Sequence, residues 1–152
     1  MQAVIKTFEQ LSTKELHAIY QLRIEIFVVE QTCYYQDVDG KDILPDTRHL
    51  MFWDNDVLAG YTRILAPGAS YPEFASIGRI ANAQTHRGIG LGHKMVEQSI
   101  VACLEYWPQS SIKISAQAHL QDFYGKHQFV TVSDEYLEDD IPHVAMVRTI
   151  AS

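Results

Sequence analysis

The sequence has little cysteine and no long hydrophobic run. Its two cysteines, Cys33 and Cys103, are too few for the disulfide framework of a small secreted domain, so we expect reduced thiols. Every apolar run is far shorter than the ~20 residues that cross a bilayer as a helix. Residues 1–10 lack the basic start and apolar stretch of a signal peptide. These absences predict a cytoplasmic protein with no membrane partner.

Basic residues are also scarce. The chain has 12 Lys and Arg against 19 Asp and Glu, a formal net charge of −7. This balance argues against a nucleic-acid partner, because phosphate contacts require clustered positive charge. It is compatible with a cationic acceptor. With 47% hydrophobic residues over 152 positions, the sequence predicts one globular domain spanning residues 1–152, since two separate cores would each be small.

Metal-binding patterns are lacking as well. The acidic run Asp-Val-Asp-Gly-Lys-Asp at residues 37–42 begins like an EF-hand, but its glycine comes too early and no closing glutamate follows. The two cysteines show no metal-ligand spacing. We therefore expect no metal, and we interpret the acidic run as a solvated loop or as the rim of an acceptor cleft.

Hydrophobic periodicity predicts a mixture of helices and strands. Ser12 and Glu15 form a capping box, and a helix with an apolar face up to Phe27 follows it. The apolar stripe from Leu91 to Trp107 predicts a long helix that Pro108 ends. Further elements are expected as strands at residues 3–8, 50–53, 57–65, 76–82, 112–116, 129–136 and 144–150, and as a short helix at 119–126. This order is typical of an α/β (α+β) domain.

Residues 87–92, Arg-Gly-Ile-Gly-Leu-Gly, lie between an expected strand and the long helix. Alternate glycines free the backbone amides to converge on an anion, and the helix start and Arg87 add positive charge. A phosphate site and a plain strand-to-helix turn explain this pattern equally well. The Walker motif is excluded because Gly92 is followed by His-Lys instead of Lys-Ser or Lys-Thr. The dinucleotide fingerprint is excluded because the spacing is G-x-G-x-G.

Two segments resemble the GNAT superfamily of acyl-CoA-dependent N-acetyltransferases. Arg87, Gly90 and Gly92 fill its signature of Arg or Gln, two residues, Gly, one residue, then Gly or Ala. Residues 117–129 resemble its Asn-x-x-Ala-x-x-x-Tyr-x-x-x-Gly-Phe segment, with Tyr124 in register. Residues 22–39, 117–121 and 141–143 resemble the ElaA-like branch. The resemblance implies the GNAT acyl-CoA N-acyltransferase fold, a mixed central sheet of six to seven strands flanked by helices.

The resemblance also implies a cofactor site and a chemistry. Acetyl-CoA is expected as co-substrate, held beside a strand that splays from its neighbour. Its implied contacts are Ile80, Ala81, Asn82, Arg87, Gly88, Ile89, Gly90, Leu91, Gly92 and Gln117. A primary amine of a small molecule or peptide would attack the thioester, and Tyr124 would protonate the leaving thiolate as general acid. Aromatic packing is the alternative role of Tyr124.

Two departures from the family pattern stand out. Gln117 replaces the usual Asn. Gln128 replaces the usual Gly before Phe129, where a positive φ is costly for a side chain, so we expect the local turn to differ.

The sequence offers several candidates for the general base. Glu30, His119 and His143 are candidates for the base, and a water relay is the alternative. Arg23 and Glu30 are seven residues apart and so lie on the same side of the expected helix. They would either bind the substrate or form a buried ion pair.

The main rival function is a non-catalytic acyl-CoA-binding or regulatory module on the same fold. An exposed strand near the C-terminus is compatible with a homodimer. The sequence does not identify the acceptor amine.

Overall fold

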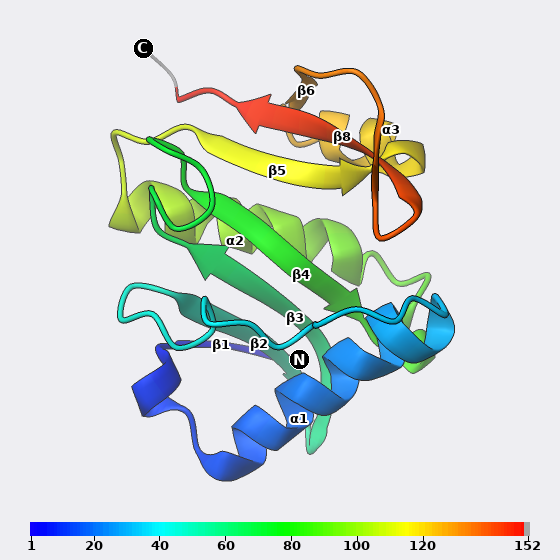
Figure 1. Cartoon of the computed structure of the whole chain (residues 1–152). Coiled ribbons are helices and arrows are strands. Elements are labelled where there is room, and N and C mark those ends of the chain that lie inside the picture. Colours follow the sequence, from blue (N-terminus) through cyan, green and yellow to red (C-terminus); the bar gives the residue numbers. More distant parts are fainter. Residues whose placement is uncertain (151–152) are drawn as a thin grey trace.

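The computed structural model describes residues 1–150, whose strands form two antiparallel sheets (Figure 1). The first sheet has the order β1-β2-β3-β4, with β1 (Gln2–Lys6), β2 (Arg48–Asp54), β3 (Val57–Leu65) and β4 (Ser76–Asn82). The second sheet has the order β5-β8-β6, and β7 also pairs with β8. Its strands are β5 (Ile112–Gln117), β6 (Val130–Thr131), β7 (Tyr136–Glu138) and β8 (Ile141–Arg148).

The two sheets meet where β4 and β5 begin. Ala75 forms a parallel bridge with Ile112; its amide donates to the Ser111 carbonyl at 3.1 Å, and the Lys113 amide donates to its carbonyl at 2.9 Å. Beyond this bridge the two strands diverge (Figure 1). The expected α/β arrangement is confirmed, with the strands divided between two sheets joined at this bridge.

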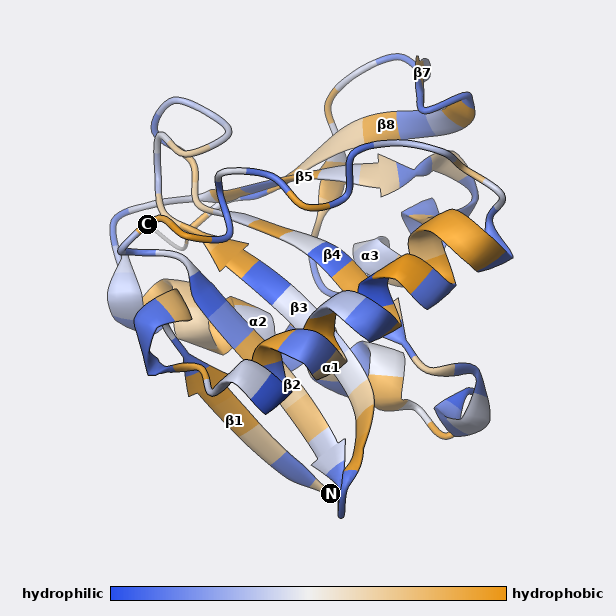
Figure 2. Cartoon of the chain, turned by 60° about the horizontal axis from the view of Figure 1, so that its bottom comes forward, coloured by the Kyte–Doolittle hydropathy of each residue, from blue (hydrophilic) through white to orange (hydrophobic). Residues whose placement is uncertain are grey.

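Two helices cover opposite faces of the first sheet. The helix α1 (Thr13–Ile24) packs through Ile19 and Leu22 on one face, and α2 (Leu91–Tyr106) packs through Met95 and Val96 on the other. The strand β3 between them is buried from Leu58 onward, and Figure 2 shows it as mostly hydrophobic with hydrophilic bands. Within residues 1–150, no helix is both long and apolar enough to cross a membrane.

The predicted start of α1 is confirmed. The Ser12 hydroxyl accepts from the Glu15 amide at 3.1 Å, and the Glu15 carboxylate accepts from the Ser12 amide at 2.8 Å. The α-helical geometry ends earlier than the apolar pattern predicts, because residues Glu25–Glu30 form a π-helix. A π-helix has more residues per turn than an α-helix, so a spacing of seven residues no longer returns to the same side.

The turn before Phe129 keeps the conformation expected of glycine. The short helix α3 (Gln121–Gly125) is followed by Gln128 with a φ of +71°. The Gln128 amide donates to the Gly125 carbonyl at 3.0 Å and the Phe129 amide to the Tyr124 carbonyl at 3.3 Å, which is the Schellman pattern of helix ends. The expectation that this turn differs is wrong, because the two hydrogen bonds hold Gln128 in the left-handed region.

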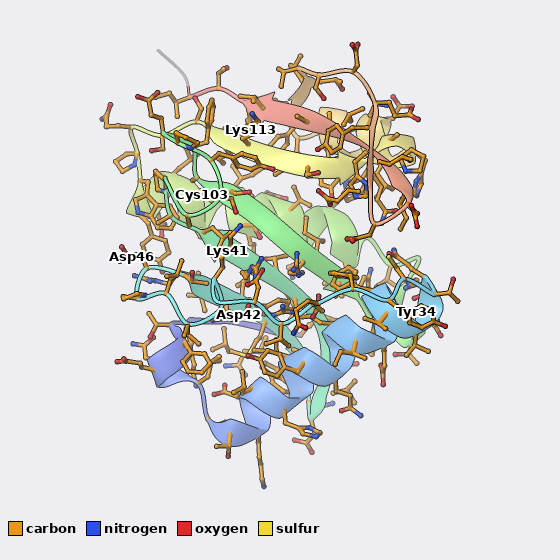
Figure 3. All side chains as sticks on the ribbon, in the orientation of Figure 1. Tyr34, Lys41, Asp42, Asp46, Cys103 and Lys113 are labelled. Carbon is orange, nitrogen blue, oxygen red and sulfur yellow. The ribbon has the colours of Figure 1, made fainter. Side chains whose placement is uncertain are left out.

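Short 3-10 turns at Phe8–Gln10, Gln84–His86 and Ala118–Leu120 complete the regular structure. From Thr32 to Thr47 the chain has no helix or strand. This segment, which carries Lys41 and Asp42, crosses the face of the first sheet (Figure 3).

Candidate active site

A cleft of about 860 Å³ opens where β4 and β5 diverge. Its walls come from distant parts of the chain: β4, the start of α2, the end of β5, α3, the β7–β8 hairpin and the segment after the π-helix. Most of the predicted cofactor residues line it, namely Ile80, Asn82, Arg87, Gly88, Gly90, Leu91, Gly92 and Gln117. Ala81 and Ile89 do not line the cleft: Ala81 is fully buried on the α1 side, and Ile89 projects its side chain into solvent.

The glycine-rich loop presents free backbone donors at one end of the cleft. Gly88 and Gly90 have φ values of +80° and +79°, and a Cβ on either would contact nothing within 4 Å, so backbone conformation requires glycine there. The amide of Lys94 makes the first α2 hydrogen bond, to the Gly90 carbonyl. Within residues 1–150, the amides of residues 88–93 donate to no atom of the chain. Together with the positive end of α2, these amides can bind an anion.

Gly92 lies against Phe123 of α3. It lies in the first turn of α2, where an added Cβ would approach the Phe123 ring at 3.4 Å. Gly92 and Phe123 both line the cleft.

Arg87 forms an ion pair with Glu30 that the sequence did not indicate. Its two terminal nitrogens donate to the two carboxylate oxygens at 2.6 and 2.7 Å. The hydrogen bond from Arg87 holds the pKa of Glu30 below its usual value. The expected pairing of Glu30 with Arg23 is wrong, because the π-helix turns Glu30 to the Arg87 side.

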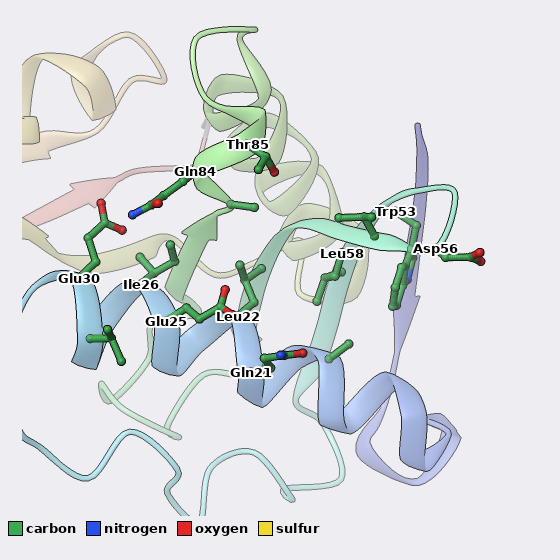
Figure 4. Close-up of a pocket in the computed structure, with 14 residues that line it drawn as sticks. Gln21, Leu22, Glu25, Ile26, Glu30, Trp53, Asp56, Leu58, Gln84 and Thr85 are labelled. Carbon is green, nitrogen blue, oxygen red and sulfur yellow. The ribbon is translucent and has the colours of Figure 1, made fainter.

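Glu30 does not line the cleft. It lies at the end of a separate groove of about 550 Å³ between α1 and the β2–β3 hairpin, which Trp53 and Leu58 also line. Figure 4 shows Glu30 beside Gln84 at this end of the groove.

The free edge of β4 offers backbone groups to the cleft. The Ala83 amide donates to the Ala59 carbonyl on β3 at 2.8 Å. Since successive residues of a strand direct their amides to opposite edges, the amides of Ile80 and Asn82 face the open side. The side-chain oxygen Oδ1 of Asn82 is buried and has no hydrogen-bond partner in the described chain. Asn82 lines the cleft, so this oxygen can accept a hydrogen bond from a ligand.

Tyr124 is the most buried phenol of the cleft wall. Only 7% of the residue is exposed, and burial raises its pKa to about 12. Its ring lies edge-on to Phe123 and Phe129, at centroid distances of 5.1 and 6.1 Å. No group in residues 1–150 hydrogen-bonds its hydroxyl. Tyr124 therefore combines the packing role with a free proton donor at the cleft.

Buried arginines hold the acidic run against the first sheet. Arg23, fully buried in α1, donates to Asp37 at 2.9 Å and to Asp42 at 2.7 Å. Arg63 of β3 donates to the same Asp42 oxygen at 3.0 Å and to Asp39 at 2.7 Å. The interpretation of a solvated loop is wrong for Asp37 and Asp42, which are 4% and 0% exposed. Their carboxylates are buried because each meets a guanidinium.

Arg79 adds a third cation at a bulge of β4. One extra residue stands in β4 opposite Thr62 of β3, and Arg79 has a φ of +49° there. Its guanidinium reaches Asp37 at 3.0 Å and Asp39 at 3.4 Å. Arg63, Arg79 and Asp39 all line the cleft, so the acidic run does rim it through Asp39.

The histidine candidates lie on the same cleft. His119 and His143 both line it, from the turn after β5 and from β8. Cys33 lines it too, and its thiol lies 3.2 Å from the Asp139 carbonyl. Within residues 1–150, no group of three or more His, Cys, Asp or Glu side chains is placed to hold a metal ion.

Comparison with known proteins identifies this arrangement. The model of the GNAT acetyltransferase domain matches residues 12–150. The chain belongs to the GNAT acetyltransferase family. It is 41% identical to protein ElaA of Escherichia coli strain K12 over 141 residues, which are 93% of this chain and 92% of that protein. The family and these similarities make it an acyl-CoA-dependent N-acetyltransferase.

Solved structures agree with the fold of this GNAT acetyltransferase. An acyl-CoA N-acyltransferase from Pseudomonas aeruginosa superposes with a TM-score of 0.93 at 45% identity, over 97% of this chain and 99% of that chain. Escherichia coli ElaA superposes with a TM-score of 0.92 at 39% identity, over 98% of this chain and 100% of that chain. Both likenesses confirm the GNAT fold, and the similarity to ElaA confirms the ElaA-like branch.

Proposed function

We propose that this acetyltransferase moves the acetyl group of acetyl-CoA to a primary amine of a small molecule or peptide by direct attack. One observation carries the proposal: a single cleft joins the free amides at residues 88–93 to the unpartnered hydroxyl of Tyr124. Acyl-CoA carries both matching groups, an anionic pyrophosphate and, at the far end of its pantetheine arm, the thioester sulfur.

The cleft suits acetyl-CoA at three further points. The loop amides and the α2 N-terminus fit the pyrophosphate. The buried Oδ1 of Asn82 can accept an N–H of the pantetheine arm, and Gln117 lies across the cleft with an amide able to do the same. The free β4 amides of Ile80 and Asn82 can pair with the arm as a neighbouring strand would. Of the remaining predicted contacts, Ile89 would act through its backbone and Ala81 by holding the strand.

The reaction needs few groups of this chain. The amine nitrogen bonds to the acetyl carbonyl carbon, and the negative charge that develops on oxygen is stabilised by a β4 amide, worth about 2.7–4 kcal/mol per donor. The amine nitrogen gives up one proton to a base or to water, the C–S bond breaks, and the sulfur takes the proton of Tyr124, which regains a proton from solvent. A phenol with a pKa of about 12 is protonated at neutral pH, as a general acid must be.

Glu30 is better suited to act through Arg87 than on the acceptor. Its carboxylate is engaged by both terminal nitrogens of Arg87, and it lies outside the cleft. We assign it the role of orienting Arg87 beside the pyrophosphate site.

The test is an acceptor screen. Acetyl-CoA binding is measured by calorimetry, and polyamines, amino acids and peptides with free amines are then offered while free coenzyme A thiol is followed. Thiol release that depends on one class of amine is expected. If acetyl-CoA binds but no amine releases thiol, the non-catalytic acyl-CoA-binding module takes the place of this proposal.

A further inference from the structure

The polar face of the second sheet carries a connected group of side chains in the cleft. Ser115 of β5, Tyr136 and Glu138 of β7, and His143 of β8 lie on one face of this sheet, opposite the buried Ile114 and Val144. Ser115, Glu138 and His143 line the same cleft as Tyr124.

A tight β-hairpin between β7 and β8 brings these side chains together. The turn residues Asp139 and Asp140 both have positive φ, +51° and +63°, which is the type I′ geometry that matches strand twist. Its register pairs Tyr136 with His143 and Glu138 with Ile141. Glu138 and His143 are thus diagonal neighbours on one face, within reach of each other.

The hydrogen bonds of His143 determine which of its ring nitrogens carries a proton. The Nδ1 atom of His143 lies 2.7 Å from the Ile141 carbonyl oxygen. A carbonyl only accepts, so Nδ1 carries a proton and the Nε2 of a neutral ring has none. That Nε2 lies 3.3 Å from Oε2 of Glu138. With a neutral ring and an ionised carboxylate, two acceptors face each other; one additional proton turns the contact into a hydrogen bond.

The other carboxylate oxygen is already satisfied. The hydroxyl of Ser115 lies 3.0 Å from Glu138 Oε1 and 2.6 Å from the Tyr136 hydroxyl. An ionised Glu138 therefore accepts a hydrogen bond from the Ser115 hydroxyl, and the Ser115 oxygen accepts one from the Tyr136 hydroxyl. These two hydrogen bonds hold the Glu138 carboxylate in place. About half of the Glu138 side chain stays exposed, whereas the His143 side chain is 9% exposed. Glu138 can touch a substrate, and His143 lies behind it.

We infer that Glu138 and His143 together form the proton acceptor for the amine, an inference that rests on the proposed function. As the amine nitrogen bonds to the acetyl carbon, its proton passes to the Glu138 carboxylate and comes to lie between Oε2 and His143 Nε2. The thiolate takes its proton from Tyr124. Loss of the first proton to solvent and return of one to Tyr124 restore the enzyme, so no other reactant is needed. Glu138 is the catalytic residue of the pair, and His143 is its positioning residue.

Three variants test the pair, each assayed with an acetyl-CoA and amine combination from the acceptor screen. Glu138→Gln keeps the shape and can donate to the neutral His143 ring, so folding is preserved while proton uptake is lost. His143→Gln removes the ring. We expect each to lower kcat about 100-fold, within the usual range for general bases, with the Kd of acetyl-CoA unchanged. The double variant is expected to lose no more than either single one, because the two residues act as a unit.

The controls separate catalysis from structure. Glu135→Gln removes the same charge from the segment that leads into the hairpin, at an exposed position outside the cleft, and is expected to retain full activity. Added formate is expected to restore part of the activity of Glu138→Ala, which a purely structural role would not allow.

The outcomes are distinct. Wild-type protein that binds acetyl-CoA and releases no thiol with any amine contradicts the proposed function and this inference with it. An active wild type with variants of unchanged kcat overturns the inference alone. So does a loss matched by an equal loss of acetyl-CoA affinity, or a double variant whose loss is the product of the two single losses.

Discussion

Tyr124 is the single residue on which the proposed chemistry depends most. Replacing Tyr124 with Phe keeps the aromatic contacts with Phe123 and Phe129 and removes only the hydroxyl. We expect kcat to fall about 100-fold, as for loss of a general acid, with the Kd of acetyl-CoA unchanged. Since burial raises the pKa of Tyr124 to about 12, the alkaline decline of kcat lies above pH 10 in the wild type and is lost in the variant. Steady-state kinetics across pH check both points, and an unchanged kcat and alkaline limb would remove Tyr124 from the mechanism.

At position 128 the chain has Gln where its family usually has Gly, and we expect this difference to lower the free energy of unfolding. A non-glycine residue in the left-handed region costs roughly 1–2 kcal/mol, and part of this is returned by the smaller entropy of its unfolded chain. We expect Gln128→Gly to raise the free energy of unfolding by about 0.5 kcal/mol, measured by urea denaturation. Gln128→Ala is the matched control: it removes the same amide and keeps the Cβ, so it should bring no gain. Equal stabilities of the two variants would contradict strain at this residue.

At the scale of elements, the glycine-rich loop, the long helix and the strands up to β5 could be predicted because local patterns specify them. The single strand expected at residues 129–136 is wrong: the chain forms β6 (Val130–Thr131) and β7 (Tyr136–Glu138), with no strand between them. The π-helix could not, since Glu25–Glu30 continues the apolar period of α1 without a break. The arginines that pair with the acidic run had only an indirect signal, Arg63 and Arg79 inside otherwise apolar strands, and their partners lie up to 42 positions away. Which aspartate meets which arginine depends on how the segment after the π-helix crosses the sheet, and no local pattern encodes that.

This crossing segment makes a clear prediction for stability. Asp42 is fully buried and its Oδ1 accepts from Arg23 and Arg63. Asp42→Asn leaves Arg23, Arg63 and Arg79 facing two carboxylates instead of three. One positive charge of the cluster is then uncompensated, so we expect a loss of about 3 kcal/mol in the free energy of unfolding. Asp46→Asn makes the same chemical change at an exposed position of the segment (Figure 3) and should cost less than about 0.5 kcal/mol. Urea denaturation of both variants measures the two losses. Similar small losses of unfolding free energy would show that the ion pairs of Asp42 are dispensable.

At the scale of the whole molecule, the division into two sheets is the feature least accessible to sequence reasoning. The periodicity of β4 and β5 predicts two strands but not that they touch only near Ala75 and Ile112. The cleft exists because they separate beyond that bridge. The family resemblance predicted that β4 separates from its neighbour. The hairpin that brings Glu138 to His143 follows from backbone angles that only the structure shows.

Folding of the whole domain should depend on pH through His49 of β2. This fully buried ring is held by Tyr61 of β3 at 2.6 Å and by the Asp42 carbonyl at 3.0 Å. The carbonyl requires a proton on Nε2, so Nδ1 accepts from the Tyr61 hydroxyl and a second proton has no place. Burial lowers the pKa of His49 below its usual value of 6.5.

Below that value the unfolded chain binds a proton that the folded protein does not. By linkage, the free energy of unfolding therefore falls as pH decreases from about 6.5 toward the folded pKa. Denaturation at pH 7.5 and 5.5 measures the loss, which His49→Asn should diminish although the variant is less stable throughout. His17→Asn, at an exposed position of α1, should keep the wild-type pH dependence. If His49→Asn loses as much stability on acidification as the wild type does, the pH dependence originates elsewhere in the fold.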